Sequence, residues 1–201
     1  MKRKPDGLPG RRRMLRAAGV LPLSAIAGGV LIARSGLAAT PECREGDEPT
    51  PRQTAGPFYK PDSPQRRSLV DSGMQGASLA IGGRVLSTDC KPIAGALLDF
   101  WHCDGSGRYD LRGYRFRGHQ FADSEGRYRL QTLHPGNYPG RTRHLHVMVQ
   151  APNRPVLVTQ LYFPGEPENA DDFIFRPDLL MRMADGRLGG TASFDFVLDL
   201  G

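Results

Sequence analysis

Residues 143–151 read Arg143-His144-Leu145-His146-Val147-Met148-Val149-Gln150-Ala151, and polar and apolar side chains alternate along this stretch. Alternation with a period of two is typical of a β-strand, in which successive side chains point to opposite faces. Leu145 and Val147 are therefore expected on a buried face, and His144 and His146 side by side on the other. The stretch predicts a strand that both contributes to a core and presents two imidazoles.

Short runs of the same kind recur from residue 79 to the end of the chain, with turn-forming Gly, Pro and Asp between them. No helical period of ten or more residues separates the runs, and only residues 170–182 could hold a short helix or turns. Many short strands bounded by turns are typical of an all-β sandwich or barrel. We predict an all-β fold, an antiparallel β-sandwich with long loops, whose strands cover residues 79–87, 96–102, 127–133, 143–151, 156–163 and 193–200.

The preceding residues, 40–78, are rich in proline, which makes a long amphipathic helix improbable there. No internal repeat or low-complexity linker divides the chain. We therefore predict three parts: a leader over residues 1–39, a loop-rich N-terminal arm over residues 40–78, and one β-sandwich domain over residues 79–201.

The leader has the features of an export signal. Basic residues 11–16 (Arg-Arg-Arg-Met-Leu-Arg) come first, an apolar run over residues 17–33 follows, and small residues at 36, 38 and 39 offer a cleavage site. This order is that of a secretory signal, and the paired arginines resemble a twin-arginine signal. We expect export to the periplasm or beyond through the twin-arginine machinery. A membrane anchor is the alternative, although the run is short and rich in Ala and Gly.

The formal charge of +6 describes the leader rather than the body. Residues 1–39 hold 8 of the 27 basic residues and one of the 21 acidic ones, so the remaining 19 basic and 20 acidic residues nearly balance. A near-neutral body gives no electrostatic indication of nucleic-acid binding. We therefore expect no nucleic-acid partner.

An exported protein can form disulfides, but the three cysteines are an odd number. Cys90 sits beside a turn and Cys103 follows the next predicted strand. If those strands form a hairpin, the two cysteines lie at its opposite ends and cannot be joined. A bridge from Cys43 to either of them stays open.

Two tyrosines on loops add to the histidine pair. Tyr138 follows the turn residues Pro135-Gly136-Asn137, and Tyr109 ends Gly107-Arg108-Tyr109 after a predicted strand. Loops at the rim of a rigid sandwich often carry sites. Two imidazoles and two phenolates would favour a hard, oxidised metal, and Fe(III) is the first candidate.

Four segments of the chain carry a family resemblance, and they occur in order: residues 54–59 (Thr-Ala-Gly-Pro-Phe-Tyr), 101–109 (Trp-His-Cys-Asp through Gly-Arg-Tyr), 135–146, and 159–163 (Thr-Gln-Leu-Tyr-Phe). Together they resemble the intradiol ring-cleavage dioxygenases, the family of catechol and protocatechuate 3,4-dioxygenases. The resemblance covers roughly residues 50–165, and four ordered motifs are more specific than any one of them. It implies a sandwich of the transthyretin-like, intradiol dioxygenase type.

The resemblance also implies roles for single residues. It places one non-haem Fe(III) per chain on Tyr109, Tyr138, His144 and His146. Arg141 matches the arginine that faces the substrate, where it would stabilise negative charge building on the ring; a salt bridge that pins its loop is the alternative. Gln160 and Tyr162 match a polar pair lining the site. The arm would cover the mouth of the pocket through Thr54, Gly56, Pro57 and Tyr59.

The implied reaction inserts both atoms of O2 into a catechol-type aromatic diol. The ring opens between the two hydroxyl-bearing carbons and gives a muconate-type diacid. Catechol, O2 and the export machinery are thus the expected partners, and assembly into a homo-oligomer is left open. The arginine-rich residues 112–117 form either a solvated loop or a recognition site for an acidic ring substituent.

Two other functions remain open from the sequence. A cupin-like barrel would use the histidine pair for Fe(II), Mn or Zn, but that class usually needs a carboxylate nearby and none lies within several residues of His144. A non-catalytic, transthyretin-like β-sandwich would be a binding module without a coloured metal site.

Overall fold

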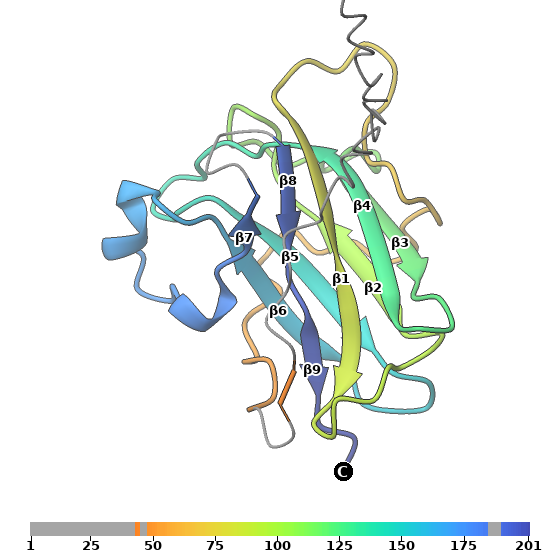
Figure 1. Ribbon diagram of the computed structural model, residues 1–201. Coiled ribbons are helices and arrows are strands. Elements are labelled where there is room, and N and C mark those ends of the chain that lie inside the picture. The colour runs from red at the N-terminus through yellow and green to blue at the C-terminus, as the bar shows by residue number, and fades with distance from the viewer. Residues whose placement is uncertain (1–42, 45–47, 185–189) are drawn as a thin grey trace, which may run out of the picture. The chain divides into compact units, whose positions relative to one another are not determined.

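The computed structural model describes residues 43–44, 48–184 and 190–201, which form two β-sheets packed face to face (Figure 1). The predicted export signal over residues 1–39 lies outside the described residues. Within the described part of the chain, no helix has the length and apolar character needed to cross a membrane. The prediction of an all-β sandwich is confirmed.

The first sheet has the strand order β4-β1-β8-β7, and β9 also pairs with β1. Its strands are β1 (Ser78–Ser87), β4 (Arg127–Leu133), β7 (Arg182–Met183), β8 (Gly190–Ser193) and β9 (Phe196–Leu198). β1 is antiparallel to β4 but parallel to β8 and β9. The prediction of a purely antiparallel sandwich is therefore wrong for this sheet, because the chain returns beside β1 in the same direction.

The second sheet has the strand order β3-β2-β5-β6, and all its pairs are antiparallel. Its strands are β2 (Leu97–Trp101), β3 (Arg117–Phe121), β5 (His144–Gln150) and β6 (Leu157–Tyr162). Two short 3-10 helices, η1 (Pro167–Ala170) and η2 (Pro177–Leu179), follow β6. η2 lies within residues 170–182, for which the sequence predicted a short helix or turns, and η1 reaches that region only at Ala170.

Each of the six predicted strands overlaps an observed one, and β4 has the predicted bounds. β3, β7 and β8 were not predicted. β3 reads Arg-Gly-His-Gln-Phe, which carries no apolar alternation. It forms because its backbone pairs with β2 on one side and, at His119, with Gln65 of the arm on the other.

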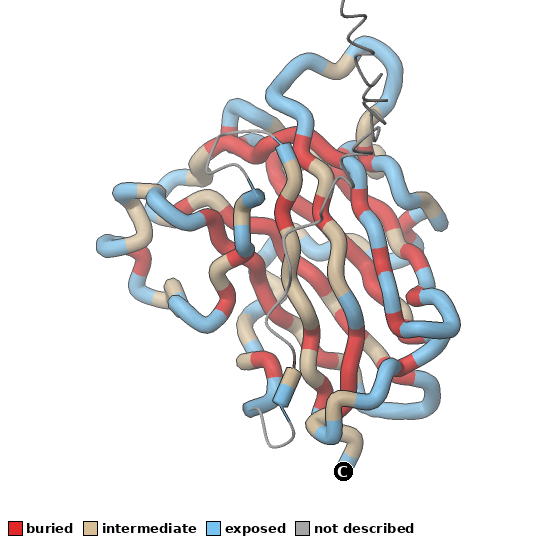
Figure 2. Tube along the Cα trace, in the orientation of Figure 1, coloured by how far each residue is buried: buried red, intermediate tan, exposed pale blue. Residues whose placement is uncertain are grey.

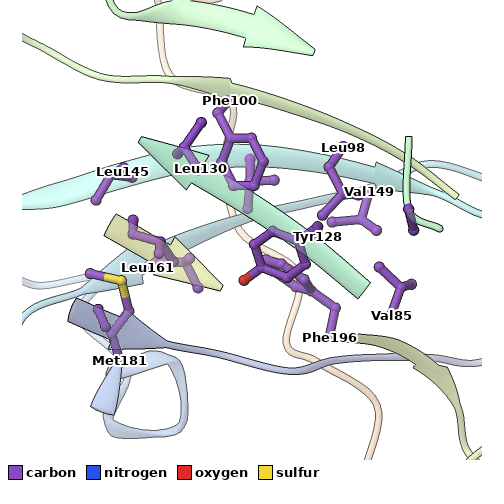
Figure 3. Close-up of a cluster of buried hydrophobic side chains, with 14 of the residues drawn as sticks. Val85, Leu98, Phe100, Tyr128, Leu130, Leu145, Val149, Leu161, Met181 and Phe196 are labelled. Carbon is purple, nitrogen blue, oxygen red and sulfur yellow. The ribbon is translucent and has the colours of Figure 1, made fainter. Parts of the chain in front are cut away.

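Alternate residues of the two sheets meet in one hydrophobic core. Figure 3 shows Phe100 and Leu145 of the second sheet facing Tyr128 and Leu130 of the first, with Phe196 closing one side. Phe100, Leu145 and Phe196 are 0% exposed. Burying a side chain of this size stabilises the fold by roughly 1.5–3 kcal/mol. Figure 2 shows the same pattern, with buried positions recurring along the strands.

Residues 48–77 of the N-terminal arm contain no strand and bind to both sheets. The Thr50 amide donates to Val197 O of β9, and the Gln53 amide donates to Val158 O of β6. Further along, the Arg66 amide donates to His119 O of β3. The arm thus crosses the outer face of the second sheet, the face on which His144 and His146 lie.

The cysteines pair in one of the two ways that the sequence left open. Cys43 and Cys90 form a disulfide with a Cα–Cα distance of 5.5 Å. Cys103 is a buried free thiol that donates to Gly136 O, and burial raises its pKa to about 11. The disulfide ties the beginning of the described chain to the turn after β1, a type of link that typically stabilises by about 2–4 kcal/mol.

Candidate metal centre

Two histidine side chains leave β5 on the face that points away from the core. Leu145 and Val147 are 0% exposed on the core side, and they hold the strand in the register that turns His144 and His146 outward. The two Nε2 atoms are 3.1 Å apart, and the rings meet edge to face with centroids 4.8 Å apart. Two nitrogens bound to one ion at about 2.1 Å each, with an angle near 90° at the ion, would be about 3 Å apart. The observed spacing of the two Nε2 atoms therefore suits binding of a single ion.

Both imidazoles are neutral near pH 7. Burial lowers the pKa of His144 to about 4 and holds the pKa of His146 well below its usual value. His144 Nδ1 lies 2.6 Å from the Thr142 carbonyl oxygen, which can only accept, so Nδ1 carries the ring proton. His144 Nε2 therefore has a lone pair available for a ligand, as metal-binding histidines require.

The two tyrosines reach this pair from separate loops. Tyr109 lies between β2 and β3, and its Oη atom is 3.4 Å from His144 Nε2. Tyr138 lies between β4 and β5, and its ring centroid is 6.0 Å from that of Tyr109. Burial raises the pKa of Tyr109 above its usual value, so this phenol needs a bound cation to act as a phenolate. The structure thus brings all four predicted ligands together.

Glycines allow the two tyrosine loops to touch backbone to backbone. A Cβ on Gly136 would lie 2.4 Å from Gly105 O, and one on Gly107 would lie 2.1 Å from Asn137 O. Gly107 also has a φ of +79°, which favours glycine. The Gly136 amide donates to Asp104 O at 2.9 Å across the contact. Any larger residue at these two positions would push the loops, and with them the tyrosines, apart.

The donor set fits Fe(III) better than the metals of the cupin-like alternative. Among the described residues, no three His, Cys, Asp or Glu side chains come together as a metal site. The histidine pair has the Tyr109 phenol oxygen beside it, and the Tyr138 ring lies next to that of Tyr109. Phenolate is a hard, anionic donor that matches an oxidised metal. The individual ligand roles of Tyr109, Tyr138, His144 and His146 stay predictions that this geometry supports.

Arg141 is fixed beside the cluster by charged and polar partners. Its Nε atom donates to Asp172 Oδ2 at 2.8 Å, and its Nη2 atom donates to Gln160 Oε1 at 2.7 Å. The Asp172 side chain is 0% exposed, and that of Arg141 is 13% exposed. The amide of Thr142 donates to the same Asp172 oxygen. A salt bridge that pins the loop is therefore present, and it also orients the guanidinium.

The predicted polar pair on β6 belongs to the same network. Gln160 Nε2 donates to Thr54 O of the arm at 2.9 Å. Tyr162 Oη lies 3.3 Å from Arg141 Nη2 and 2.8 Å from Gln53 Oε1. Burial raises the pKa of Tyr162 to about 12, so its hydroxyl stays protonated. Gln160 and Tyr162 therefore connect Arg141 to the arm, and on β6 they lie opposite His146 and His144. The Tyr162 ring is 6.3 Å from that of His144.

Part of the predicted arm motif does cover the cluster. Gly56 has a φ of +65°, and a Cβ there would lie 3.3 Å from His146 Cε1. Thr54 Oγ1 accepts from the Gly56 amide and so supports this turn. Phe58 stacks on Tyr109 with ring centroids 4.5 Å apart and meets Tyr138 edge to face. The arm thereby shields the tyrosines from water.

The other two members of the motif, Pro57 and Tyr59, are exposed. The Tyr59 ring packs edge to face on Trp101, with centroids 5.0 Å apart, and makes no ring contact with the predicted tyrosine ligands. Trp101 in turn stacks on His146 at 4.9 Å with an interplanar angle of 4°. Tyr59 therefore reaches the cluster only through Trp101.

The sequence did not predict the contacts of three residues at the cluster. They are Phe58, Asp172 and Trp101, which stacks on His146. Phe58 stands inside the quoted arm motif and had a usable signal. Asp172 lies 31 residues after Arg141 in a segment without motif or periodicity, so nothing in the sequence pairs the two.

The arginine-rich residues 112–117 are not uniformly a solvated loop. Arg112 and Arg115 are exposed, but Arg117 is 2% exposed and begins β3 beside Trp101. Arg117 Nη2 donates to Asp110 O, next to Tyr109. Its buried position indicates support for the Tyr109 loop.

A cavity of about 300 Å³ lies against the loop that carries Tyr138 and Arg141. It is lined also by Asn137, Pro139, Gly140, Thr142, Glu168, Asp171 and Asp172. Tyr109, His144 and His146 do not line it.

Comparison with known proteins places these features in a family. A family model described as dioxygenase matches residues 54–200. The catechol 1,2-dioxygenase of Pseudomonas sp. (strain EST1001) is 31% identical, with 65% of this chain and 53% of that protein aligned. The hydroxyquinol 1,2-dioxygenase of Corynebacterium glutamicum is 30% identical, with 70% and 55% aligned. The chain spans about half the length of these curated relatives.

Solved structures agree with this similarity. The dioxygenase domain of a dioxygenase–carbohydrate-binding protein fusion from Streptomyces sp. SirexAA-E is 55% identical, with a TM-score of 0.74 over 77% of this chain and 100% of that one. Catechol 1,2-dioxygenase from Pseudomonas arvilla C-1 is 27% identical, with a TM-score of 0.67 over 76% and 63%.

Replacing Gly136 by alanine tests the contact between the loops. We expect Gly136→Ala to weaken Fe(III) binding by about tenfold or more, because its Cβ would clash with Gly105 O and displace Tyr138. Far-UV circular dichroism should stay that of the parent. Iron stoichiometry and affinity are measured by titration.

Gly105→Ala is the matched control, since a Cβ there meets nothing within 4 Å. It should bind iron as the parent does. Parental iron affinity in Gly136→Ala would show that the loop contact does not position the ligands.

Proposed function

This chain belongs to the intradiol ring-cleavage dioxygenase family, and from that premise we propose that it is a non-haem Fe(III) enzyme acting on a catechol-type aromatic diol. Both atoms of O2 would enter the substrate, and the ring would open between the two hydroxyl-bearing carbons to give a muconate-type diacid. The observation that carries the proposal is the convergence of two neutral imidazoles and two phenols from three separate segments.

The proposed substrate class follows from the relatives. Curated relatives are named for catechol, hydroxyquinol and 6-chlorohydroxyquinol, which are all single-ring compounds. We therefore propose a single-ring diol with adjacent hydroxyls rather than a fused-ring or polymeric substrate.

Four side chains would hold the metal, and their chemistry sets the charge of the site. His144 and His146 contribute neutral nitrogen, whereas Tyr109 and Tyr138 contribute one negative charge each once deprotonated. Bound Fe(III) would activate and orient the diol for reaction with O2, rather than make a water nucleophile. The Oη atom of either tyrosine can take up a substrate proton, so no separate general base is needed.

Arg141 would act electrostatically. Asp172 and Gln160 hold its guanidinium beside Tyr138 before any substrate arrives, so no reorganisation is needed when negative charge develops on the ring. Gly56 and Phe58 keep water away from the histidine and tyrosine side chains. Exclusion of water strengthens the interaction of Arg141 with that charge.

We also propose that the protein is exported with residues 1–39 as a twin-arginine signal, followed by the arm over residues 40–78 and the catalytic sandwich over residues 79–201. The basic, apolar and small-residue order of the leader supports this. The Cys43–Cys90 disulfide supports an oxidising compartment.

The proposed reaction is tested with iron-loaded protein. We expect a visible tyrosinate-to-Fe(III) absorption band that changes on addition of catechol, together with O2 uptake and a muconate-type product. Tyr138→Phe should weaken the band and the activity together, because a phenolate ligand is lost. Tyr114→Phe is the control, since the Tyr114 hydroxyl donates to Pro61 O outside the cluster.

The outcomes separate the alternatives. A colourless protein without turnover would indicate a transthyretin-like binding module. A colourless protein that is active with Fe(II) or Zn would indicate the cupin-like chemistry. An unchanged spectrum in Tyr138→Phe would remove Tyr138 from the ligand set.

Asp172→Asn tests the positioning of Arg141. We expect kcat to fall by about tenfold to a hundredfold, because the guanidinium loses the carboxylate that orients it. Iron content and the visible band should not change, since Asp172 is no ligand. Asp178→Asn, at an exposed carboxylate outside the cavity and the cluster, is the control and should keep parental kcat. Loss of iron from Asp172→Asn would show a structural role instead.

Export is tested with Arg11→Lys combined with Arg12→Lys, because the twin-arginine pathway reads the paired guanidinium groups. We expect the variant to remain in the cytoplasm, while Arg3→Lys, outside the pair, is exported. Normal arrival of the double variant in the periplasm would contradict the proposal.

A further inference from the structure

The outer face of the first sheet carries a furrow that the proposed reaction does not use. It has a volume of about 690 Å³, and strands β4, β1, β8 and β7, side by side in Figure 1, form its floor and walls. The metal centre lies on the outer face of the second sheet. The core separates the two faces, so the furrow is not an extension of the catalytic cavity.

Strand register explains the shape of the furrow. β1 runs through the middle of the sheet and presents small residues outward, Ala80 and Gly82. Gly82 pairs with Arg129 of β4 on one side and with Ser193 of β8 on the other. Ser193 in turn pairs with Arg182 of β7. Gly82 thus forms part of a floor between β4 and β7, which both carry arginines. These two strands are three strand spacings apart, or roughly 14 Å.

The walls are strongly basic although the body as a whole is nearly neutral. Arg67, Arg84, Arg127, Arg129 and Arg182 line the furrow, and all five are exposed. Of these five arginines, Arg127 is the only one that forms an ion pair with a described residue, and its partner is Glu125. Among the described residues of the lining, Asp195 is the one acid, and its carboxylate accepts from the Arg84 amide at 2.7 Å. Most charged groups of the described lining are therefore cationic.

Uncharged hydrogen-bonding groups lie between the arginines. Ala80 pairs with Gln131 on β4 and with Thr191 on β8, and Ser68 bridges to Gln131 from the arm. Together with Ser193 they offer hydroxyl and amide groups along the floor. Guanidinium groups recognise carboxylates in a bidentate manner, and hydroxyl and amide groups suit sugar hydroxyls.

We propose that this furrow binds one extended chain of an acidic polysaccharide whose sugars carry carboxylates, a polyuronate. The furrow has room for one chain between Arg129 and Arg182, and arginines two residues apart on β4, Arg127 and Arg129, are spaced about 7 Å along it. They would contact successive carboxylates, while the small residues of β1 allow the sugar rings to approach the backbone.

Other anionic partners fit less well. Single-stranded nucleic acid needs exposed aromatic rings for base stacking. A membrane surface needs apolar side chains that insert. The large exposed hydrophobic residues of the described chain are Tyr59, Leu111, Phe121 and Phe173, and none of them lines the furrow.

The test measures binding of the protein to polygalacturonate by isothermal titration calorimetry. Fully methyl-esterified pectin has the same backbone without the charge and serves as the neutral probe. We expect binding to polygalacturonate that weakens with salt, and none to the ester. Arg84→Gln combined with Arg129→Gln should raise the Kd by about tenfold or more, because two charge-assisted contacts are lost.

Arg115→Gln combined with Arg154→Gln is the matched control. It removes the same charge from exposed positions outside the furrow and should change the Kd less than about twofold. Turnover of a small catechol should be the same in the furrow variant and the parent, so failure of this proposal and failure of the proposed reaction are separate results.

Three outcomes would overturn the proposal. They are absence of binding to polygalacturonate, equal weakening by the two double variants, and binding of a single-stranded DNA oligonucleotide at least as tight as that of polygalacturonate. The last two would indicate general electrostatic attraction rather than a built site.

Discussion

The two-residue period of β5 is the constraint on which the rest of the molecule depends. The strand turns Leu145, Val147 and Val149 into the core, where all three are 0% exposed. The same register leaves His144 and His146 on the other face with their Nε2 atoms 3.1 Å apart. Because a slip of one residue would exchange the two faces, the core packing that fixes the register also fixes the position of the histidine pair.

The other groups of the centre depend on contacts between loops. Tyr109 and Tyr138 meet because Gly107 and Gly136 let two loop backbones approach more closely than any side chain would permit. Arg141 depends on the buried carboxylate of Asp172, and the arm closes over the cluster through Gly56 and Phe58. A rigid strand and several loops held by hydrogen bonds thus combine in one site, a common arrangement for catalytic centres on β-sandwiches.

The two sheets divide the surface of the described chain into faces of different chemistry. The second sheet is covered by the arm and carries the phenol and imidazole cluster, in a buried environment that keeps both histidines neutral. The first sheet is open and carries the arginine-lined furrow. Under the two proposals, the protein would hold a carboxylated matrix on one face while a small substrate enters at the other.

Much of the fold and of the candidate site could be predicted from the sequence alone. Alternation in residues 79–87, 127–133 and 143–151 predicted the strands, because period two has no other common cause. The ordered motifs pointed to the four residues of the cluster, which stay predicted ligands, and to Arg141. β3 could not be predicted, since its polar sequence becomes a strand only through pairing with β2 and the arm. The parallel return of β8 and β9 beside β1, the choice of Cys90 over Cys103 for the disulfide, and the Arg141–Asp172 pair also required the folded chain. Each joins residues far apart in sequence, and a local pattern carries no information about which distant segment will lie beside it.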